Sequence, residues 1–492
     1  MYYLAAEDYQ RLIFAQSLVT QKFHIGAMKY LFDFMDPFWT ASRAFGSLER
    51  RKNWEIHPLQ TAYDYAELMK FNSQIAQKGM VGTADAVKEL CEREWRRIQD
   101  RRDEGVVEYW ENLNHHLDIV LDKFPKQIQA IKSKFGFHFE NGGYRKFFET
   151  DRFLVYQVLP TAPDVEVDDG LKPVLIMHPY VLGPNILAFL PEEGKSYVHC
   201  FANQGIPTYM RILKDIHSNP PVQLMTGEDD AEDTREICMA LKDKHGRQVT
   251  LNGFCQGGFM AVIDILSGRL DGYVDALITC VAPMDGTRSK AIIEYMEHLP
   301  SRYRDLRYAL KPAASGNRVV DGRVMSWVYK LKSMEKEFSW VTYFRDLNNL
   351  RTEHGEDPKI SNTAAALLHW LFFDRSDLPV NITKLSFDSY TVPVEEDGTL
   401  PVRLFGRKLN FKGLEEKGIK WLLCYADEDD LVDREAAIAP CDFVSPEITV
   451  FPKGHGAIAT SWSLPTSACA LHGTFTYKGK EYCGPVCFQM GL

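Results

Sequence analysis

The chain has 492 residues, which is too long for one ordinary domain, since roughly 150 residues per domain predicts about three units. Hydrophobic residues make up 45% of the sequence and aromatic residues 12%, which is enough material for a large globular core. The net charge of −10 argues against nonspecific binding to nucleic acid, because such binding needs a basic surface.

Ten cysteines are scattered along the chain without a repeated pair spacing, which is typical of reduced thiols in a cytoplasmic protein. Cys483 and Cys487 lie close in sequence, but no second pair or histidine cluster accompanies them, so we expect no metal site. Charges at Glu7 and Asp8 argue against a signal peptide, and no run of about 18 apolar residues predicts a membrane span.

Residues 1–137 form a predicted N-terminal helical region. Apolar residues at Val107, Trp110, Leu113 and Leu117 follow helical spacing, and the opposite faces of such segments carry charge. An amphipathic region of this kind packs on its own chain or on a partner. We interpret the pair His115-His116 as surface polar residues and find no chemistry in this region.

Residues 138–284 carry alternating strand and helix patterns. Such alternation predicts a parallel α/β sheet with right-handed crossovers. A helix is expected over residues 230–244, between the apolar runs 205–211 and 248–252. The apolar runs expected to be strands are 153–159, 173–178, 205–211, 248–252 and 273–281.

The centre of this segment is Gly253-Phe-Cys-Gln-Gly-Gly258, which follows a strand and opens an apolar helical run. The pattern predicts a nucleophile elbow, in which Cys255 is held in a strained, exposed position between small residues. A thiol at a helix N-terminus is shifted toward thiolate, and the N–H of Gln256 would face a developing oxyanion. The alternative is a glycine-rich turn around a buried structural cysteine.

Between residues 285 and 410 the alternation stops, and we interpret this insertion as a cap over the site. Residues 411–492 resume the sheet with strands over 418–425 and 447–451, and the tail 474–483 suggests a small hairpin.

Three residue types then follow in the order nucleophile, acid, histidine. Cys255 follows one strand, an aspartate in the loop 427–433 follows another, and His455 follows a third. This is the order of the α/β-hydrolase topology, and open parallel sheets place their sites at the carboxyl ends of the strands. His455 would deprotonate Cys255, and the carboxylate would orient the imidazole ring. Asp427 and Asp430 are alternatives to Asp429 for the acid.

The same motifs resemble those of the polyhydroxyalkanoate synthases, over roughly residues 150–465. Residues 253–258 resemble the Gly-x-Cys-x-Gly-Gly box in which that family replaces the serine of the hydrolases by cysteine. The other segments that resemble the family are the loop 177–184, the segments 370–379 and 405–411, the acid loop 428–432 and the Gly-His motif 454–456.

This resemblance implies an α/β-hydrolase fold with a parallel-sheet core, a large cap insertion and an N-terminal helical region. It also implies that Cys255 is the acylated nucleophile, Asp429 the acid and His455 the base. The expected substrate is a hydroxyacyl-CoA, whose acyl group is loaded on the cysteine and passed to a growing polyester without a cofactor or metal. The residues expected to form the oxyanion and substrate loop are Gln256, His178, Pro179 and Tyr180.

Two departures from the family pattern are visible. Asp430 stands where the family usually has a histidine after the acid, and the segment 224–230 lacks the expected tryptophan motif. Two other functions are therefore kept as alternatives: an ester or thioester hydrolase on the same scaffold, and a non-catalytic scaffold at a polymer granule. The N-terminal helices and the cap are the surfaces that we expect to contact a second copy or a partner subunit.

Overall fold

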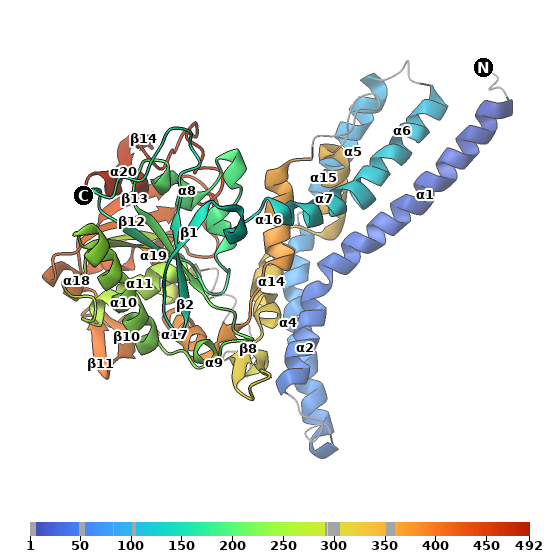
Figure 1. Ribbon diagram of the computed structural model, residues 1–492. Coiled ribbons are helices and arrows are strands. Elements are labelled where there is room, and N and C mark those ends of the chain that lie inside the picture. The colour runs from blue at the N-terminus through green and yellow to red at the C-terminus, as the bar shows by residue number, and fades with distance from the viewer. Residues whose placement is uncertain are drawn as a thin grey trace. The chain divides into compact units, whose positions relative to one another are not determined.

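A computed structural model of the protein describes residues 6–48, 55–81, 83–100, 105–290, 293, 306–350 and 360–492. The chain divides into two compact units, of which the first contains residues 1–133 and 323–372 and the second residues 134–322 and 373–492 (Figure 1). The predicted cap segment 285–410 is thus shared between the two units, because its middle part packs with the N-terminal helices.

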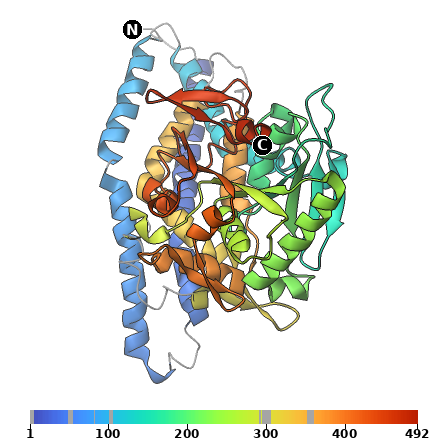
Figure 2. The same ribbon diagram turned by 90° about the vertical axis from the view of Figure 1, so that its left-hand side faces the viewer.

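The first unit is helical, and its long helices are seen from another side in Figure 2. Val19 of α1 packs against Leu117, Val120 and Tyr343, which come from segments far apart in the sequence. Its helices are α1 (Ala6–Phe34), α2 (Asp36–Leu48), α4 (Pro58–Val81), α5 (Thr83–Asp100), α6 (Val106–Asp118), α7 (Phe124–Ala130), α13 (Gly322–Met325), α14 (Trp327–Lys336), α15 (Ser339–Asn349) and α16 (Asn362–Phe373).

A few hydrogen bonds join distant helices inside this unit. The Trp327 indole donates to Asn72 Oδ1 (3.0 Å), and the Tyr30 hydroxyl donates to Asp346 Oδ2 (2.7 Å). The N-terminal helical region is confirmed, but the interpretation of His115-His116 as surface residues is wrong for His116, which is buried. The reason is that His116 lies one helical turn after Leu113, on the face of α6 that packs against the core of the unit.

The second unit is built on an eight-stranded sheet in the order β1-β2-β4-β3-β5-β6-β12-β13. Strand β2 runs antiparallel to β1 and β4, and the other neighbours pair in parallel. The strands are β1 (Tyr144–Glu149), β2 (Phe153–Val158), β3 (Val174–Met177), β4 (Thr208–Leu213), β5 (Val249–Phe254), β6 (Val274–Cys280), β12 (Lys420–Ala426) and β13 (Glu447–Phe451).

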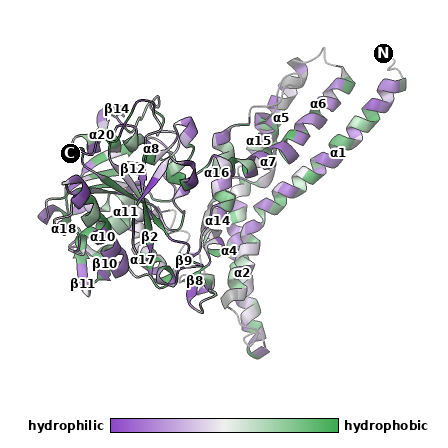
Figure 3. Cartoon of the chain, in the orientation of Figure 1, coloured by the Kyte–Doolittle hydropathy of each residue, from purple (hydrophilic) through white to green (hydrophobic). Residues whose placement is uncertain are grey.

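The central strands are apolar on both faces because helices cover the sheet on both sides. Every residue of β3 and β5 is buried, and Figure 3 shows hydrophobic residues in the strands and along α11. Helix α10 (Gly227–His245) begins with a capping box in which Thr226 and Asp229 bond to each other's backbone N–H. It ends at Gly246, whose φ of 66° closes the helix.

This strand order, with a parallel core and an elbow after β5, is that of the α/β-hydrolase fold, which confirms the predicted fold class. A large insertion separates β6, which ends at Cys280, from β12, which begins at Lys420. Strand β1 was not predicted, because its mixed apolar and charged residues suit an edge strand that shows no regular alternation.

Smaller elements complete this unit. They are α8 (Tyr197–Ala202), α9 (Pro220–Gln223), α11 (Gln256–Leu266), α17 (Val380–Thr391), α18 (Lys412–Glu416), α19 (Arg434–Ala437), α20 (Pro485–Met490), the sheet of β7 (Leu310–Pro312), β8 (Arg318–Val320) and β9 (Leu378–Pro379), and the hairpins β10 (Thr399–Leu404) with β11 (Arg407–Asn410) and β14 (Thr474–Tyr477) with β15 (Lys480–Cys483). The last hairpin confirms the one predicted in the tail. None of the helices that the structure describes combines the length and apolarity needed to cross a bilayer.

Candidate active site

Cys255 occupies the sharp turn between β5 and α11. Its backbone has φ 51° and ψ −126°, a strained conformation for a residue other than glycine. The turn is held by hydrogen bonds on both sides, since the Cys255 N–H donates to the Cys280 carbonyl (2.8 Å) and the Cys255 carbonyl accepts from the Gly258 N–H (2.9 Å). The strained elbow predicted from the sequence is therefore present.

The glycines around the turn are required by close backbone contacts. A Cβ atom at Gly253 would lie 2.3 Å from the Cα of Gly258, and one at Gly257 would lie 2.2 Å from the carbonyl oxygen of Met177. Either contact is far shorter than real side chains allow. The start of α11 therefore packs directly against β5 and the end of β3, which fixes the position of Cys255.

Asp429 and His455 meet at the end of the sheet, on the loops that follow β12 and β13. The Nδ1–H of His455 donates to Asp429 Oδ2 at 2.7 Å. The other carboxylate oxygen accepts from the N–H groups of Leu431 (2.9 Å) and Val432 (3.0 Å). Because these bonds fix the carboxylate and occupy Nδ1, the ring is held in one orientation with Nε2 as its remaining nitrogen.

The two alternative acids differ in their surroundings. Asp427 accepts from the hydroxyl of Tyr477 (2.8 Å) and pairs with Lys478, both on the hairpin of β14 and β15. That ion pair and hydrogen bond lower the pKa of Asp427. The hydrogen bond of His455 goes to Asp429 rather than to Asp427 or Asp430. The hairpin thus holds the base of the acid loop.

The surroundings of His455 shift its pKa in opposite directions. Burial alone would lower the pKa of His455, but the carboxylate of Asp429, its hydrogen bond to the ring and the nearby Cys255 hold the pKa well above its ordinary value. Nε2 makes no hydrogen bond of regular geometry with the residues that the structure describes. Long or poorly aligned contacts are common in substrate-free sites. The structure therefore brings together Cys255, His455 and Asp429.

The expectation that Cys255 is exposed is wrong, since only 8% of the residue is accessible. The reason is that the turn is enclosed by neighbouring segments. The His455 ring meets Phe254 edge to face at 5.8 Å between ring centroids, and the end of β3 lies against Gly257. A buried nucleophile of this kind is shielded from bulk water.

The loop after β3 carries the other predicted residues. The N–H of Val181 donates to the side-chain Oε1 of Gln256 at 3.2 Å, which ties the loop to the start of α11. The N–H of Gln256 is the first of that helix and has no intrahelical partner, so it is available to an oxyanion. Pro179 has no N–H and can contribute no such donor.

The side chains of His178 and Tyr180 are buried and meet edge to face at 5.4 Å. Burial lowers the pKa of His178 to about 4, so the ring is neutral at neutral pH, and its Nδ1 lies 3.1 Å from the Pro179 carbonyl oxygen. The Tyr180 hydroxyl is bound to Asp230 and Arg211. These two side chains support the loop from within.

Arg211 and Asp230 were not singled out from the sequence, and neither was Asp264. The available signal was a charge inside an apolar pattern: Arg211 ends the apolar run 205–211, and Asp264 interrupts the apolar helix α11. Charged residues at such positions are almost never fully buried unless they are paired. Among the described residues, no group of three or more His, Cys, Asp or Glu could hold a metal ion.

No protein-family model matches the chain, and no curated protein is significantly similar to it. Similar solved structures include a carboxylesterase of Nitrososphaera gargenis, with 15% identity, 64% of this chain and 92% of that chain covered, and a TM-score of 0.35. An esterase domain from Rhodothermus marinus has 15% identity, with 66% of this chain and 92% of that chain covered and a TM-score of 0.31. An esterase from Rhodococcus sp. ECU1013 has 12% identity, with 65% of this chain and 94% of that chain covered and a TM-score of 0.33.

The fold assignment rests on the strand order and the elbow of this chain rather than on those similarities. Together, the sheet, the cysteine elbow and the paired histidine and aspartate define a protein of the α/β-hydrolase class.

Proposed function

We propose that the protein is an acyltransferase similar to the polyhydroxyalkanoate synthases, which lengthens a polyester from hydroxyacyl-CoA through an acyl group on Cys255. The observation that carries the proposal is the position of His455, whose Nδ1 is bound to Asp429 and whose ring meets Phe254, the neighbour of Cys255, at 5.8 Å between ring centroids. A nucleophile next to a base that is itself oriented by a third group is the arrangement that covalent acyl transfer needs.

In the first half-reaction, His455 takes the proton of Cys255 and the sulfur attacks the thioester carbonyl. The negative charge that develops on the carbonyl oxygen is stabilised by the N–H of Gln256. Collapse of the intermediate breaks the carbon–sulfur bond to CoA, and the His455 imidazolium returns its proton to the leaving thiolate. The products are acyl-Cys255 and free CoA.

In the second half-reaction, the hydroxyl of another acyl unit attacks acyl-Cys255. His455 accepts the hydroxyl proton and then returns it to the cysteine sulfur, so that an ester forms and the thiol is restored. Cysteine supports transfer because its thioester is passed readily to an alcohol when water is kept away. The burial of Cys255 supports this order of events.

The growing polyester and a second protein chain are the proposed partners. Large apolar side chains remain exposed on the helical unit, among them Phe14, Phe32 and Trp39. Exposed apolar surface of this kind supports contact with another copy, a partner subunit or the surface of the polymer.

Incubation with hydroxyacyl-CoA tests the proposal through its products. We expect release of CoA together with insoluble polyester from the wild type, and neither from Cys255→Ala. Release of free hydroxy acid without polymer would instead establish the hydrolase. If neither product forms and cellular function survives Cys255→Ala, the protein is a non-catalytic scaffold.

A further inference from the structure

A cluster of buried charges lies behind the loop that follows β3. Arg211 of β4 and Asp230 of α10 are buried, with 1% and 0% of each residue accessible. Two hydrogen bonds join them, from Arg211 Nη1 to Asp230 Oδ1 (2.8 Å) and from Nη2 to Oδ2 (3.1 Å). This paired contact fixes the plane of the guanidinium group.

Tyr180 connects this cluster to the loop. Its hydroxyl accepts a hydrogen bond from Arg211 Nη2 (3.0 Å) and donates one to Asp230 Oδ1 (2.7 Å). The Tyr180 hydroxyl therefore both accepts and donates a hydrogen bond within the cluster. The guanidinium also lies 4.6 Å from the centre of the Phe153 ring, which places it against a core strand.

The rest of the cluster extends to the elbow helix. The Thr234 hydroxyl is bonded to Arg211 Nη1 (2.6 Å) and to Asp264 Oδ2 (2.9 Å). Asp264 belongs to α11, the helix that begins directly after Cys255. The loop after β3 and the elbow helix are thus connected through one set of side-chain hydrogen bonds.

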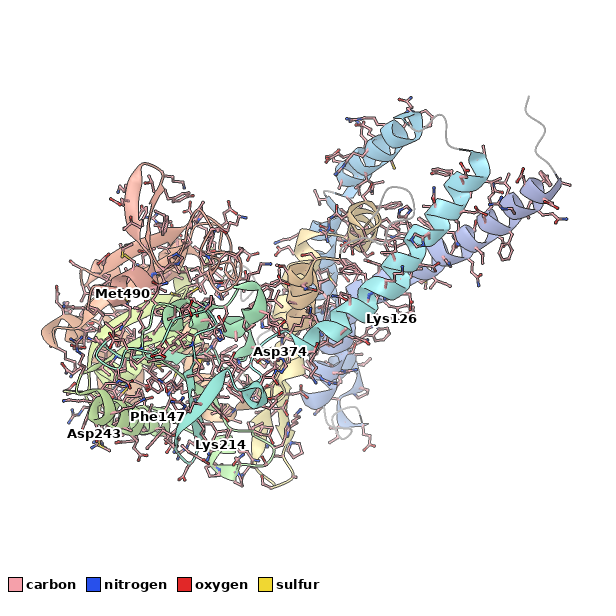
Figure 4. The ribbon with its side chains drawn as sticks, turned by 45° about the horizontal axis from the view of Figure 1, so that its top comes forward. Lys126, Phe147, Lys214, Asp243, Asp374 and Met490 are labelled. Atoms are coloured by element: carbon pink, nitrogen blue, oxygen red, sulfur yellow. The ribbon has the colours of Figure 1, made fainter. Side chains whose placement is uncertain are left out.

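The loop is also held at two further points. Val181 donates to Gln256 Oε1, as described above. Where the loop ends, Asn185 accepts from the N–H of Phe137 (3.2 Å) and donates to Asp374 (3.2 Å), which is labelled in Figure 4. The chain between His178 and Asn185 is therefore bonded to the rest of the unit at its start, middle and end.

Burying an arginine with carboxylates is a poor way to gain stability. The loss of hydration costs several kcal/mol per ion, and apolar residues of similar size often give equal or greater stability. What the cluster provides is a fixed geometry for the loop after β3, which is bonded to the residue after Cys255 through Val181 and Gln256. An oxyanion site needs such fixed geometry, because its donors act only if they are already in place.

We infer that Tyr180, held by Arg211 and Asp230, is a positioning residue that fixes the loop after β3 so that the acyl oxygen is bound beside Cys255. Tyr180 acts through the loop backbone and through Gln256, and its own hydroxyl stays within the cluster. This inference rests on the proposed acyl chemistry at Cys255.

Two reactions of Cys255 distinguish a loss of positioning of the loop after β3 from a general disruption of the Cys255 turn. Acylation by a hydroxyacyl-CoA develops an oxyanion, whereas alkylation by iodoacetamide needs only the thiolate. For Tyr180→Phe we expect the rate of acylation to fall about 10-fold to 100-fold. This is less than the roughly 10²-fold to 10³-fold cost of removing an oxyanion donor, because the donor remains and is only displaced. The rate of Cys255 alkylation, followed by peptide mass, should stay within about 2-fold of wild type.

Tyr30→Phe is the matched control, since Tyr30 also donates from a partly buried hydroxyl to an aspartate, in the helical unit. It should leave both rates unchanged. Equal acylation by Tyr180→Phe and wild type would overturn the inference, as would a parallel fall in both rates. If Tyr180→Phe does not fold, Asp230→Asn replaces it, with the same split expected. Absence of acylation in the wild type would instead contradict the proposed function.

Discussion

The two units of the chain use polar residues differently. In the sheet unit, charged and polar side chains are buried and bonded in pairs. Arg211 is bonded to Asp230, and His455 is bonded to Asp429. In the helical unit, helices pack mainly through apolar contacts, while large apolar side chains such as Phe14 and Leu59 remain exposed. The buried polar groups of the sheet unit suit the catalytic role that we propose for it, and the exposed apolar side chains of the helical unit suit the proposed contact with a partner.

The difference follows from how each architecture fixes a side chain. A parallel sheet covered on both faces brings loops from separate strands to one edge and anchors them through buried partners. A helical bundle fixes its residues through packing and leaves one face of each outer helix in water. Changes near the Cys255 turn should thus alter the reactivity of Cys255, and changes in the core of the helical unit should alter stability without altering that reactivity.

The largest expected effect comes from the base. Substitution His455→Ala removes the proton acceptor of Cys255 and should lower the rate of acylation about 10²-fold to 10⁴-fold, the usual range for a general base. Quenched-flow measurement of CoA release gives this rate. His217→Ala is the control, because His217 lies exposed on the sheet unit and should leave the rate unchanged. An acylation rate for His455→Ala near that of wild type would remove His455 from the mechanism.

The next effect tests the turn itself. Gly253→Ala places a methyl group 2.3 Å from the Cα of Gly258, so we expect a loss of ~1–3 kcal/mol or more in the free energy of unfolding. Cys255 alkylation should slow as the turn is displaced. Denaturant unfolding and alkylation rates check both results. Gly143→Ala, where no atom lies within 4 Å of the added methyl group, should change neither.

A matching change in the helical unit tests the comparison directly. In Gly79→Ala the new methyl group meets the carbonyl oxygen of Met334 at 2.1 Å, where α4 approaches α14. We expect a loss of ~1–3 kcal/mol in stability, as for other overpacked contacts, with the rate of Cys255 alkylation unchanged. A fall in alkylation equal to that of Gly253→Ala would show that the two units do not differ in the way described.

The smallest expected effect is on the pH dependence of the free energy of unfolding. The pKa of His455 is raised above the ordinary 6.5, because its interactions with Asp429 and Cys255 outweigh the burial that would lower it. A raised pKa gives stability that is fully present below about pH 6.5 and is lost as pH rises through the folded-state pKa. Asp429→Asn removes a charge that raises this pKa, so its free energy of unfolding should fall less steeply with pH. Denaturant unfolding between pH 6 and pH 9 measures this, and an unchanged slope would contradict it.

Much of the sheet unit could be predicted from the sequence. The apolar runs around Val249 and Glu447 became strands, and the glycines that flank Cys255 predicted the elbow because only glycine fits so close to Met177 and Gly258. The order of Cys255, an aspartate and His455 along the chain then placed three loops at one edge of the sheet.

Other features depend on tertiary contacts that no local pattern reveals. The burial of Cys255 accompanies the packing of Phe254 against His455 and of Gly257 against the end of β3, which come from distant parts of the sequence. The pairing of Arg211 with Asp230 joins residues on a strand and a helix whose sequences are each ordinary. The packing of residues 323–372 with the N-terminal helices likewise joins segments that are separated in sequence by residues 134–322, the first part of the sheet unit.

Mass spectrometry of the acylated protein tests the central claim most directly. After brief incubation with a hydroxyacyl-CoA, the wild type should carry one hydroxyacyl group, and peptide mapping should locate it at Cys255. Cys255→Ala should carry none under the same conditions. An unmodified wild type, or an acyl group that persists in Cys255→Ala, would contradict the account.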